Sequence, residues 1–171
     1  MSLSSVKYGI AFLFLLFVSS AFAASSQGVV VLDFELNDLT YAENNQAEVA
    51  RTATLAPLLR EALSKRPHLH LISLRDEEYL AANQGFGYLY QHANAVTELG
   101  KSKQADWVVV TRLHKPSFLF AYLMAHAVHV PSGKALPERI VEIKGQQEKL
   151  NQRGINKLSE QIAQQIANHP D

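Results

Sequence analysis

The sequence predicts a mixed α/β (α+β) fold, in which helices flank a single sheet of parallel and antiparallel strands. Residues 28–36 and 107–114 begin with near-continuous valine and leucine, which is typical of central strands covered on both faces. Helical patterns separate the early strands, as parallel crossovers require, and short turns separate the late ones, as in antiparallel hairpins. The expected order along the chain is β-α-β-α-α-β-β-β-α, with the five strands in the spatial order 2-1-3-4-5.

The first strand is expected over residues 28–36, followed by a polar loop over 37–47. Its alternation divides the side chains between two faces, with one set predicted to share a face: Val30, Leu32, Phe34 and Leu36. A helix is expected next, because apolar residues recur at helical spacing: Leu55, Leu58, Leu59, Ala62 and Leu63. Thr54 is the expected N-cap of this helix, which places Pro57 in the first turn, where its missing N–H costs little.

The middle of the chain predicts a short strand and two helices. Pro67 precedes a strand over residues 68–74, and a helix over 76–82 follows. After a loop at 84–87, a second helix over 93–99 is expected to end at Gly100 as its C′ residue.

The second half predicts three strands and a terminal helix. Residues 107–114 form a strand that Pro116 ends, residues 118–130 alternate as the next strand, and 139–143 form the last. The terminal helix is marked by four apolar residues: Ile155, Leu158, Ile162 and Ile166. An aromatic stripe on the long strand is expected to belong to the core, and the alternative is an exposed edge that binds a partner: Phe118, Phe120 and Tyr122.

The composition limits the classes of function. The 171 residues are one domain's length, and 16 Lys+Arg against 16 Asp+Glu argue against a broad basic face for nucleic acid. The chain contains no cysteine, so disulfides, thiolate metal sites, a cysteine nucleophile and lipidation on cysteine are excluded.

The amino terminus predicts export by a cleavable signal peptide. Lys7 precedes an apolar run over residues 9–18, which is shorter than a membrane-spanning helix needs. Ala21-Phe22-Ala23 then forms a small-x-small site, with cleavage expected between Ala23 and Ala24. Residues 1–23 are therefore the expected signal, residues 24–171 the single mixed α/β domain, and the periplasm the expected location.

Motifs for catalysis, cofactors and metals are incomplete. Gly100-Lys101-Ser102 lacks the P-loop's first glycine, because position 95 is alanine, and no G-x-S-x-G elbow occurs. His126 and His129 are expected on opposite faces of one strand, although His114 could meet either of them across a hairpin. We expect no catalytic residues, no metal and no cofactor, and the chain is more consistent with a non-enzyme than with an enzyme.

Polar groups follow the strands that are expected to be parallel. Ligands of open α/β sheets bind beyond the carboxyl ends of such strands. The candidate ligand or partner rim there consists of Glu35, Asp38, Arg75, Lys115 and Ser117. One interpretation is a set of exposed ion pairs, each worth only ~0–1 kcal/mol. The other is that Arg75 and Lys115 receive an anionic group from a small ligand or from a partner's carboxylate.

The chain resembles a family of predicted secreted bacterial proteins of unknown function. The segments that carry this resemblance are residues 29–36, 105–110, 114–118, 132–133, 141–145 and 153–154. The strand–helix–strand pattern leading into hairpins is also similar, more distantly, to the amino-terminal domain of the Tol translocation protein and to the curli-secretion lipoprotein. These resemblances imply a mixed α/β envelope module used for assembly and binding. The lipidated cysteine of the curli protein is absent, so pore formation is not implied.

These observations favour an exported, non-catalytic periplasmic module for binding or envelope assembly. Its expected partner is an envelope protein or a small anionic ligand, with no nucleic acid and no membrane span after cleavage. The alternative is a periplasmic hydrolase, or a ligand-binding enzyme accessory, that uses the polar groups at the carboxyl ends of the strands.

Overall fold

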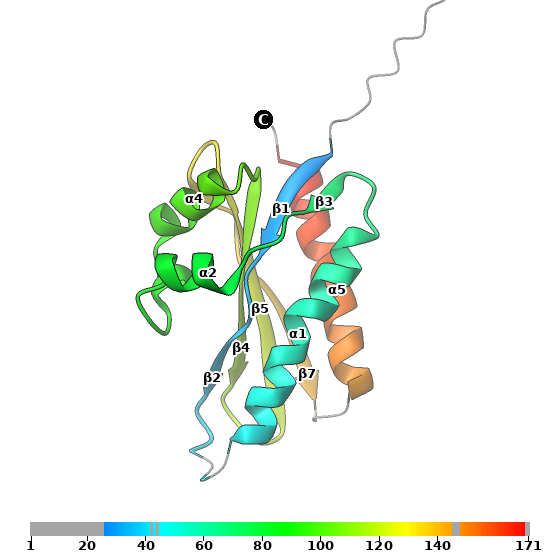
Figure 1. Ribbon diagram of the computed structural model, residues 1–171. Coiled ribbons are helices and arrows are strands. Elements are labelled where there is room, and N and C mark those ends of the chain that lie inside the picture. Colours follow the sequence, from blue (N-terminus) through cyan, green and yellow to red (C-terminus); the bar gives the residue numbers. More distant parts are fainter. Residues whose placement is uncertain (1–25, 42, 44, 145–147, 170–171) are drawn as a thin grey trace, which may run out of the picture.

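The protein, as a computed structural model, is described over residues 26–41, 43, 45–144 and 148–169. Figure 1 shows one sheet with helices on both faces. The strands are β1 (Gln27–Val31), β2 (Glu35–Asp38), β3 (Leu69–Leu71), β4 (Trp107–Lys115), β5 (Phe120–His129), β6 (Lys134–Ala135) and β7 (Arg139–Lys144). The helices are α1 (Gln46–Ser64), α2 (Asp76–Ala82), α3 (Tyr88–Gln91), α4 (Ala93–Ser102) and α5 (Glu148–Ala167). Within this described part, no helix has the length and apolar character of a membrane span.

The sheet has the predicted mixed topology. The strand order is β3-β1-β4-β5-β6, with β2 also paired to β4 and β7 also paired to β5. β1 runs parallel to β3 and to β4, where Val30 lies opposite Val108. β4 and β5 form a long antiparallel pair. The expected spatial order and the two central parallel strands are therefore confirmed.

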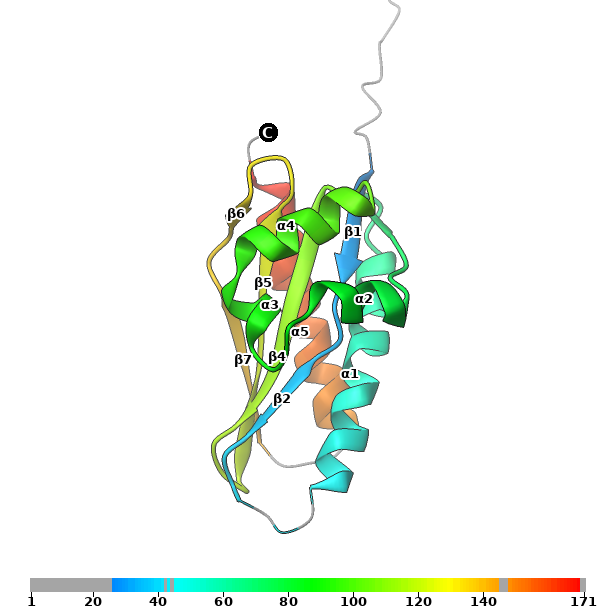
Figure 2. The same cartoon turned by 60° about the vertical axis from the view of Figure 1, so that its left-hand side comes forward.

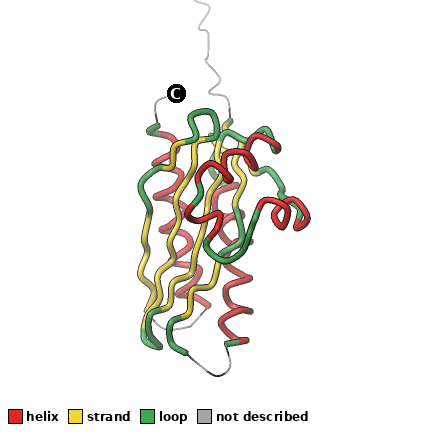
Figure 3. Tube along the Cα trace, turned by 90° about the vertical axis from the view of Figure 1, so that its left-hand side faces the viewer, coloured by secondary structure: helices red, strands yellow, loops and turns green. Residues whose placement is uncertain are grey.

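The helices cover the two faces of the sheet unequally. α1 and α5 cover one face along its length, whereas α2, α3 and α4 cover only part of the other (Figures 2 and 3). The core of the α1/α5 face contains alternate residues of β5: Ala121, Leu123, Ala125 and Ala127. Phe120 and Tyr122 alternate with these residues, so they lie on the other face and stay half-buried. Phe118 is 63% exposed, so the expectation that the aromatic stripe belongs to the core was wrong.

The first predicted strand is divided in two by residues 32–34. β1 pairs with the first part of β4 and β2 with the last part, and the irregular residues between them reverse the alternation. Leu32 therefore packs in the core under α2–α4, whereas Phe34 packs in the core under α1 and α5. Arg60 donates to the carbonyl of Val31 at 2.8 Å, and the Thr111 hydroxyl donates to the carbonyl of Leu32 at 3.0 Å. These bonds satisfy backbone groups that the break would otherwise leave unpaired.

Helix α1 begins eight residues before the predicted N-cap. Thr54 lies inside the helix, where its hydroxyl donates to the carbonyl of Arg51, and Pro57 lies in the helix interior. The buried stripe of α1 starts with two polar residues, Glu48 and Thr52, before the apolar ones. The apolar pattern consequently shows only the later part of the helix.

Helix α4 also extends beyond its predicted end. It continues to Ser102, so Gly100 is a helical residue and not the C′ residue. A Cβ atom on Gly100 would lie 2.9 Å from a methyl of Val108 and closer still to one of Val130. Gly100 is therefore the point at which the helix backbone approaches the sheet, a role that turn statistics do not reveal.

Candidate functional site

The parallel strands β2 and β4 end together at the tip of the molecule. Asp38 pairs in register with Lys115, and the N–H of Leu39 donates to the carbonyl of Lys115 at 2.9 Å. The loop after β2 and the turn after β4 are thereby joined, beside the start of α1 (Figure 1). We call this region the foot, and it comprises the described residues of 39–49 together with residues 115–119.

A chain of buried ion pairs supports the foot from inside. The Lys115 ammonium lies 3.0 Å from a carboxylate oxygen of Glu48 and 3.5 Å from one of Asp38. Glu48 in turn lies 3.3 Å from Arg51, whose guanidinium donates twice to the Asn151 amide oxygen, at 2.8 and 3.0 Å. Two cations balance two carboxylates, so the group is neutral as a whole. The members of this group come from β2, β4, α1 and α5. Their ion pairs and hydrogen bonds therefore connect both loops of the foot to the two long helices.

Asp38 has the clearest electrostatic perturbation in this group. Burial alone would raise its pKa, but the hydroxyl and N–H of Thr40, donating at 2.7 and 2.9 Å, and the nearby Lys115 hold the pKa below its usual value. The stabilisation contributed by Asp38 is present above the pKa of the unfolded carboxyl. It is lost as the pH falls through the lower pKa of the folded protein.

The structure brings together some of the residues expected at the rim. Asp38 and Lys115 form an ion pair, and Ser117 lies in the adjoining turn, where its hydroxyl accepts from the N–H of Leu119. Glu35 lies on β2 but contacts the opposite face of the sheet, where it pairs with Arg112 at 2.7 Å.

Arg75 does not join the other rim residues. It precedes α2, where its guanidinium donates to Glu78 at 2.9 Å, and Lys103 also contacts Glu78 at 2.9 Å. The hydrogen bonds from Arg75, followed by that from Lys103, lower the pKa of Glu78 to about 2. The separation arises because β3 is short and pairs only with residues 27–29 of β1, whereas β4 continues far beyond that point. The carboxyl ends of these strands therefore do not form one rim.

Arg112 forms a second polar cluster, on the face that α3 covers. Its guanidinium lies 3.7 Å from the centre of the Tyr90 ring and 5.2 Å from that of Phe86. The Tyr90 hydroxyl donates to Glu138, and burial followed by this hydrogen bond raises the pKa of Tyr90. Glu35 accepts from the N–H of Gly87, so this cluster holds the loop before α3 against β4.

The foot carries most of the large apolar side chains that are exposed in the described part of the chain. Among the described residues, eight large apolar side chains are exposed, and five of them lie here: Leu39, Tyr41, Val49, Phe118 and Leu119. Their exposed fractions range from 44% to 91%. Patches of this kind mark interaction sites on soluble proteins. The prediction placed Phe118 in the core, and its alternative, an exposed edge that binds a partner, included Phe118 but none of Leu39, Tyr41 and Val49. The available signal was position, since Phe118 and Leu119 follow Pro116 and Ser117 in the connection between two strands.

The three histidines considered for a metal site across the hairpin do not meet, although His129 and His169 are in edge-to-face ring contact. His114 lies opposite Tyr122 in the β4–β5 pair, whereas His126 lies opposite Val110 and His129 opposite Trp107. His114 therefore meets neither of the histidines that the hairpin could have brought to it. Within the described residues, no three His, Cys, Asp or Glu side chains are placed to hold a metal ion.

Comparisons with known proteins agree with this fold. A family model with the description "Protein of unknown function (DUF2380)" matches residues 27–162. A search of the curated proteins finds no significant match. TolB from Acinetobacter baumannii matches with a TM-score of 0.53 and 14% identity, over 86% of this chain and 30% of that chain. This likeness shows a shared fold and confirms the predicted resemblance to the Tol protein, whereas the resemblance to the curli-secretion lipoprotein stays a prediction.

Two further solved structures are similar at lower scores. The LpoB C-terminal domain from Salmonella enterica has a TM-score of 0.48 and 15% identity, over 74% of this chain and 87% of that chain. Lipoprotein GNA1162 from Neisseria meningitidis has a TM-score of 0.45 and 18% identity, over 85% of this chain and 99% of that chain.

Proposed function

The chain belongs to the protein family of unknown function whose model matches residues 27–162, and we propose that this member is an exported, non-catalytic binding module of the cell envelope. In this proposal, the foot docks a protein partner. The observation that carries it is the gathering of five exposed large apolar side chains on two adjacent loops and the start of α1.

The buried ion pairs beneath the foot favour binding of a partner, because they hold its loops in place. Lys115 is 4% exposed and binds carboxylates from both β2 and α1. Loops that are already ordered lose less conformational entropy when a partner binds. In this proposal, Asp38, Lys115 and Ser117 position the apolar side chains and do not contact a ligand, and Glu35 and Arg75 have no part in docking.

The charge of the foot favours a protein surface over an anionic polymer or membrane. Between residues 39 and 49 and between 115 and 119, the sequence contains one basic residue, Lys115. That residue is buried and paired with two carboxylates. Binding to phosphate backbones or anionic lipids relies on exposed Lys and Arg, whereas aromatic and apolar anchors are typical of protein interfaces.

Export follows from the predicted signal peptide, which lies outside the described residues. We expect protein recovered from the periplasmic fraction to begin at or near Ala24, because a signal peptidase would remove residues 1–23. Intact-mass spectrometry and amino-terminal sequencing measure this directly. Recovery of the chain with Met1 in place from the membrane fraction would contradict export by cleavage.

Docking can be tested by photo-crosslinking in living cells. A photoreactive phenylalanine analogue at Leu119 should give a discrete adduct with one protein. Leu119 is 76% exposed, and Leu80 on α2 is an apolar control of similar exposure, at 69%. The analogue at Leu80 should give no such adduct, because α2 lies away from the foot (Figure 2). Adducts are read on denaturing gels and identified by mass spectrometry.

A second variant distinguishes specific docking from nonspecific adsorption to exposed apolar side chains. Phe118→Asp in the chain that carries the analogue at Leu119 should abolish the adduct while leaving the melting temperature within ~2 °C, because Phe118 is exposed. Equal adducts from Leu80 and Leu119, or an adduct that survives Phe118→Asp, would refute docking through the foot.

A further inference from the structure

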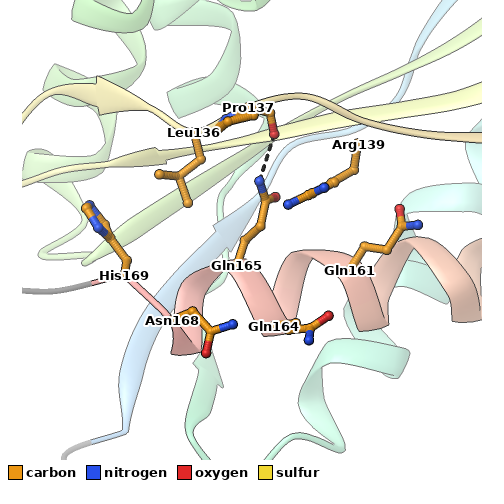
Figure 4. A pocket seen from close by; sticks show the side chains of 8 residues that line it. All are labelled: Leu136, Pro137, Arg139, Gln161, Gln164, Gln165, Asn168 and His169. Carbon is orange, nitrogen blue, oxygen red and sulfur yellow. Dashed lines mark hydrogen bonds between the residues drawn. The ribbon is translucent and has the colours of Figure 1, made fainter.

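An open cavity, lined mainly by residues with polar side chains, lies between α5 and the segment that joins β6 to β7 (Figure 4). Its volume is about 580 Å³, within the usual range for small-molecule sites. Three residues line it from the β6–β7 side: Leu136, Pro137 and Arg139. Five line it from the end of α5: Gln161, Gln164, Gln165, Asn168 and His169. The cavity is separate from the foot and shares no residue with it.

Helix α5 presents a row of amides to this cavity. The four amide residues follow one another at helical spacing, so they share one face of the helix: Gln161, Gln164, Gln165 and Asn168. Gln165 donates to the carbonyl of Pro137 at 2.9 Å. A carbonyl only accepts, so this bond fixes the orientation of the amide and directs its oxygen elsewhere.

Several polar atoms around the cavity are buried without a hydrogen-bond partner. Among the described residues, these atoms are Arg139 Nε, Gln161 Oε1, Gln165 Oε1 and His169 Nε2. Buried polar groups are nearly always hydrogen-bonded, and groups left over at one place indicate a missing partner. These groups include an N–H donor and two carbonyl acceptors, so a ligand that offers both acceptors and donors would satisfy them.

The charge of the lining residues limits the chemical class of ligand that the cavity could bind. Among the described residues of the lining, Arg139 is the only one with a permanent charge, and none of them is a carboxylate. No ion pair of Arg139 is found within the described part of the chain. A guanidinium beside amides matches a planar carboxylate flanked by N–H groups.

We propose that this cavity binds the free carboxyl terminus of a peptide. Arg139 receives the carboxylate, the amide oxygens of Gln161 and Gln165 accept from backbone N–H groups of the peptide, and Leu136 and Pro137 contact its last side chain. A sugar acid carries the same charge, but sugar rings stack on aromatic side chains, and the lining contains no Phe, Tyr or Trp. The site is independent of the foot and would hold whether or not the foot binds a protein.

Calorimetry with the purified protein, isolated as the cell processes it, tests this site. The probe is the tripeptide Ala-Ala-Leu with a free carboxyl terminus, compared with the same tripeptide capped as an amide. We expect the free acid to bind at least tenfold more tightly, because the capped form cannot pair with the guanidinium. Glucuronate, which has the same charge and no amide, should bind at least tenfold more weakly than the free tripeptide.

Two variants and a matched control assign the binding to the cavity. Arg139→Gln should weaken binding of the free tripeptide at least tenfold, whereas Arg153→Gln, on the exposed side of α5, should leave it unchanged. Gln161→Leu should weaken binding and leave the melting temperature unchanged or higher, because it removes an unpartnered acceptor. Equal binding of both tripeptides, tighter binding of glucuronate, or no binding at millimolar concentration would overturn the proposal.

Discussion

Lys115→Met is expected to lower the free energy of unfolding by about 3–5 kcal/mol, the range seen when one partner of a buried ion pair is removed. Lys115 is 4% exposed, and its ammonium contacts Asp38 and Glu48. Without it, two carboxylates stay buried against a single remaining cation, Arg51. Urea denaturation at neutral pH, followed by circular dichroism, measures the change.

A matched control distinguishes this effect from the loss of a surface lysine. Lys134→Met, on the exposed strand β6, should change the free energy of unfolding by no more than about 0.5 kcal/mol. Combining Lys115→Met with Asp38→Asn should recover much of the lost stability, because Glu48 then still balances Arg51 and no uncompensated carboxylate remains. If Lys115→Met alone is as stable as the parent chain, the ion pairs do not support the foot.

Gly100→Ala is expected to lower the free energy of unfolding by about 1–3 kcal/mol, the usual cost of overpacking a core. The added methyl would lie 2.9 Å from a methyl of Val108 and closer to one of Val130, and both valines are buried. Alanine favours a helix over glycine by up to about 1 kcal/mol, so this gain offsets part of the cost. Thermal or urea denaturation gives the net change.

A double variant identifies the clash as the cause. Val130→Ala removes the nearest methyl group that the new Cβ would meet and leaves the one of Val108, so Gly100→Ala with Val130→Ala should be more stable than the two single losses predict together. Asn94→Ala, at an exposed position of the same helix, is the control for helix propensity and should be close to neutral. Strict additivity of the two single effects, or a Gly100→Ala chain more stable than the parent, would refute the close approach.

The buried ion pairs and the exposed apolar side chains of the foot belong to the same loops. The ion pairs involving Lys115 hold the loops in place, and the exposed side chains on those loops form the proposed docking surface. Lys115→Met should therefore weaken the Leu119 adduct as well as the fold, whereas Phe118→Asp should affect only the adduct.

The fold class and the order of the strands could both be predicted from the amino-acid pattern alone. The valine-rich runs that became β1 and β4 indicated central strands, and the lengths of the connections separated parallel crossovers from antiparallel hairpins. Both signals are local, because they depend on the residues of one segment and on the spacing to the next. The strand order therefore followed without any knowledge of side-chain contacts.

Which site residues meet depends on the packing of distant segments and could not be predicted from the sequence. The break at residues 32–34 moved Phe34 to the opposite core, and the short β3 kept Arg75 away from Lys115. Glu48 was not predicted to be a buried residue of the site. A polar residue is normally assigned to the exposed face of a helix, and the buried position of Glu48 is explained only by its ion pair with Lys115 on β4. Such positions depend on pairing between segments far apart in the chain, and hydrophobic periodicity reports only which face of a single segment is buried.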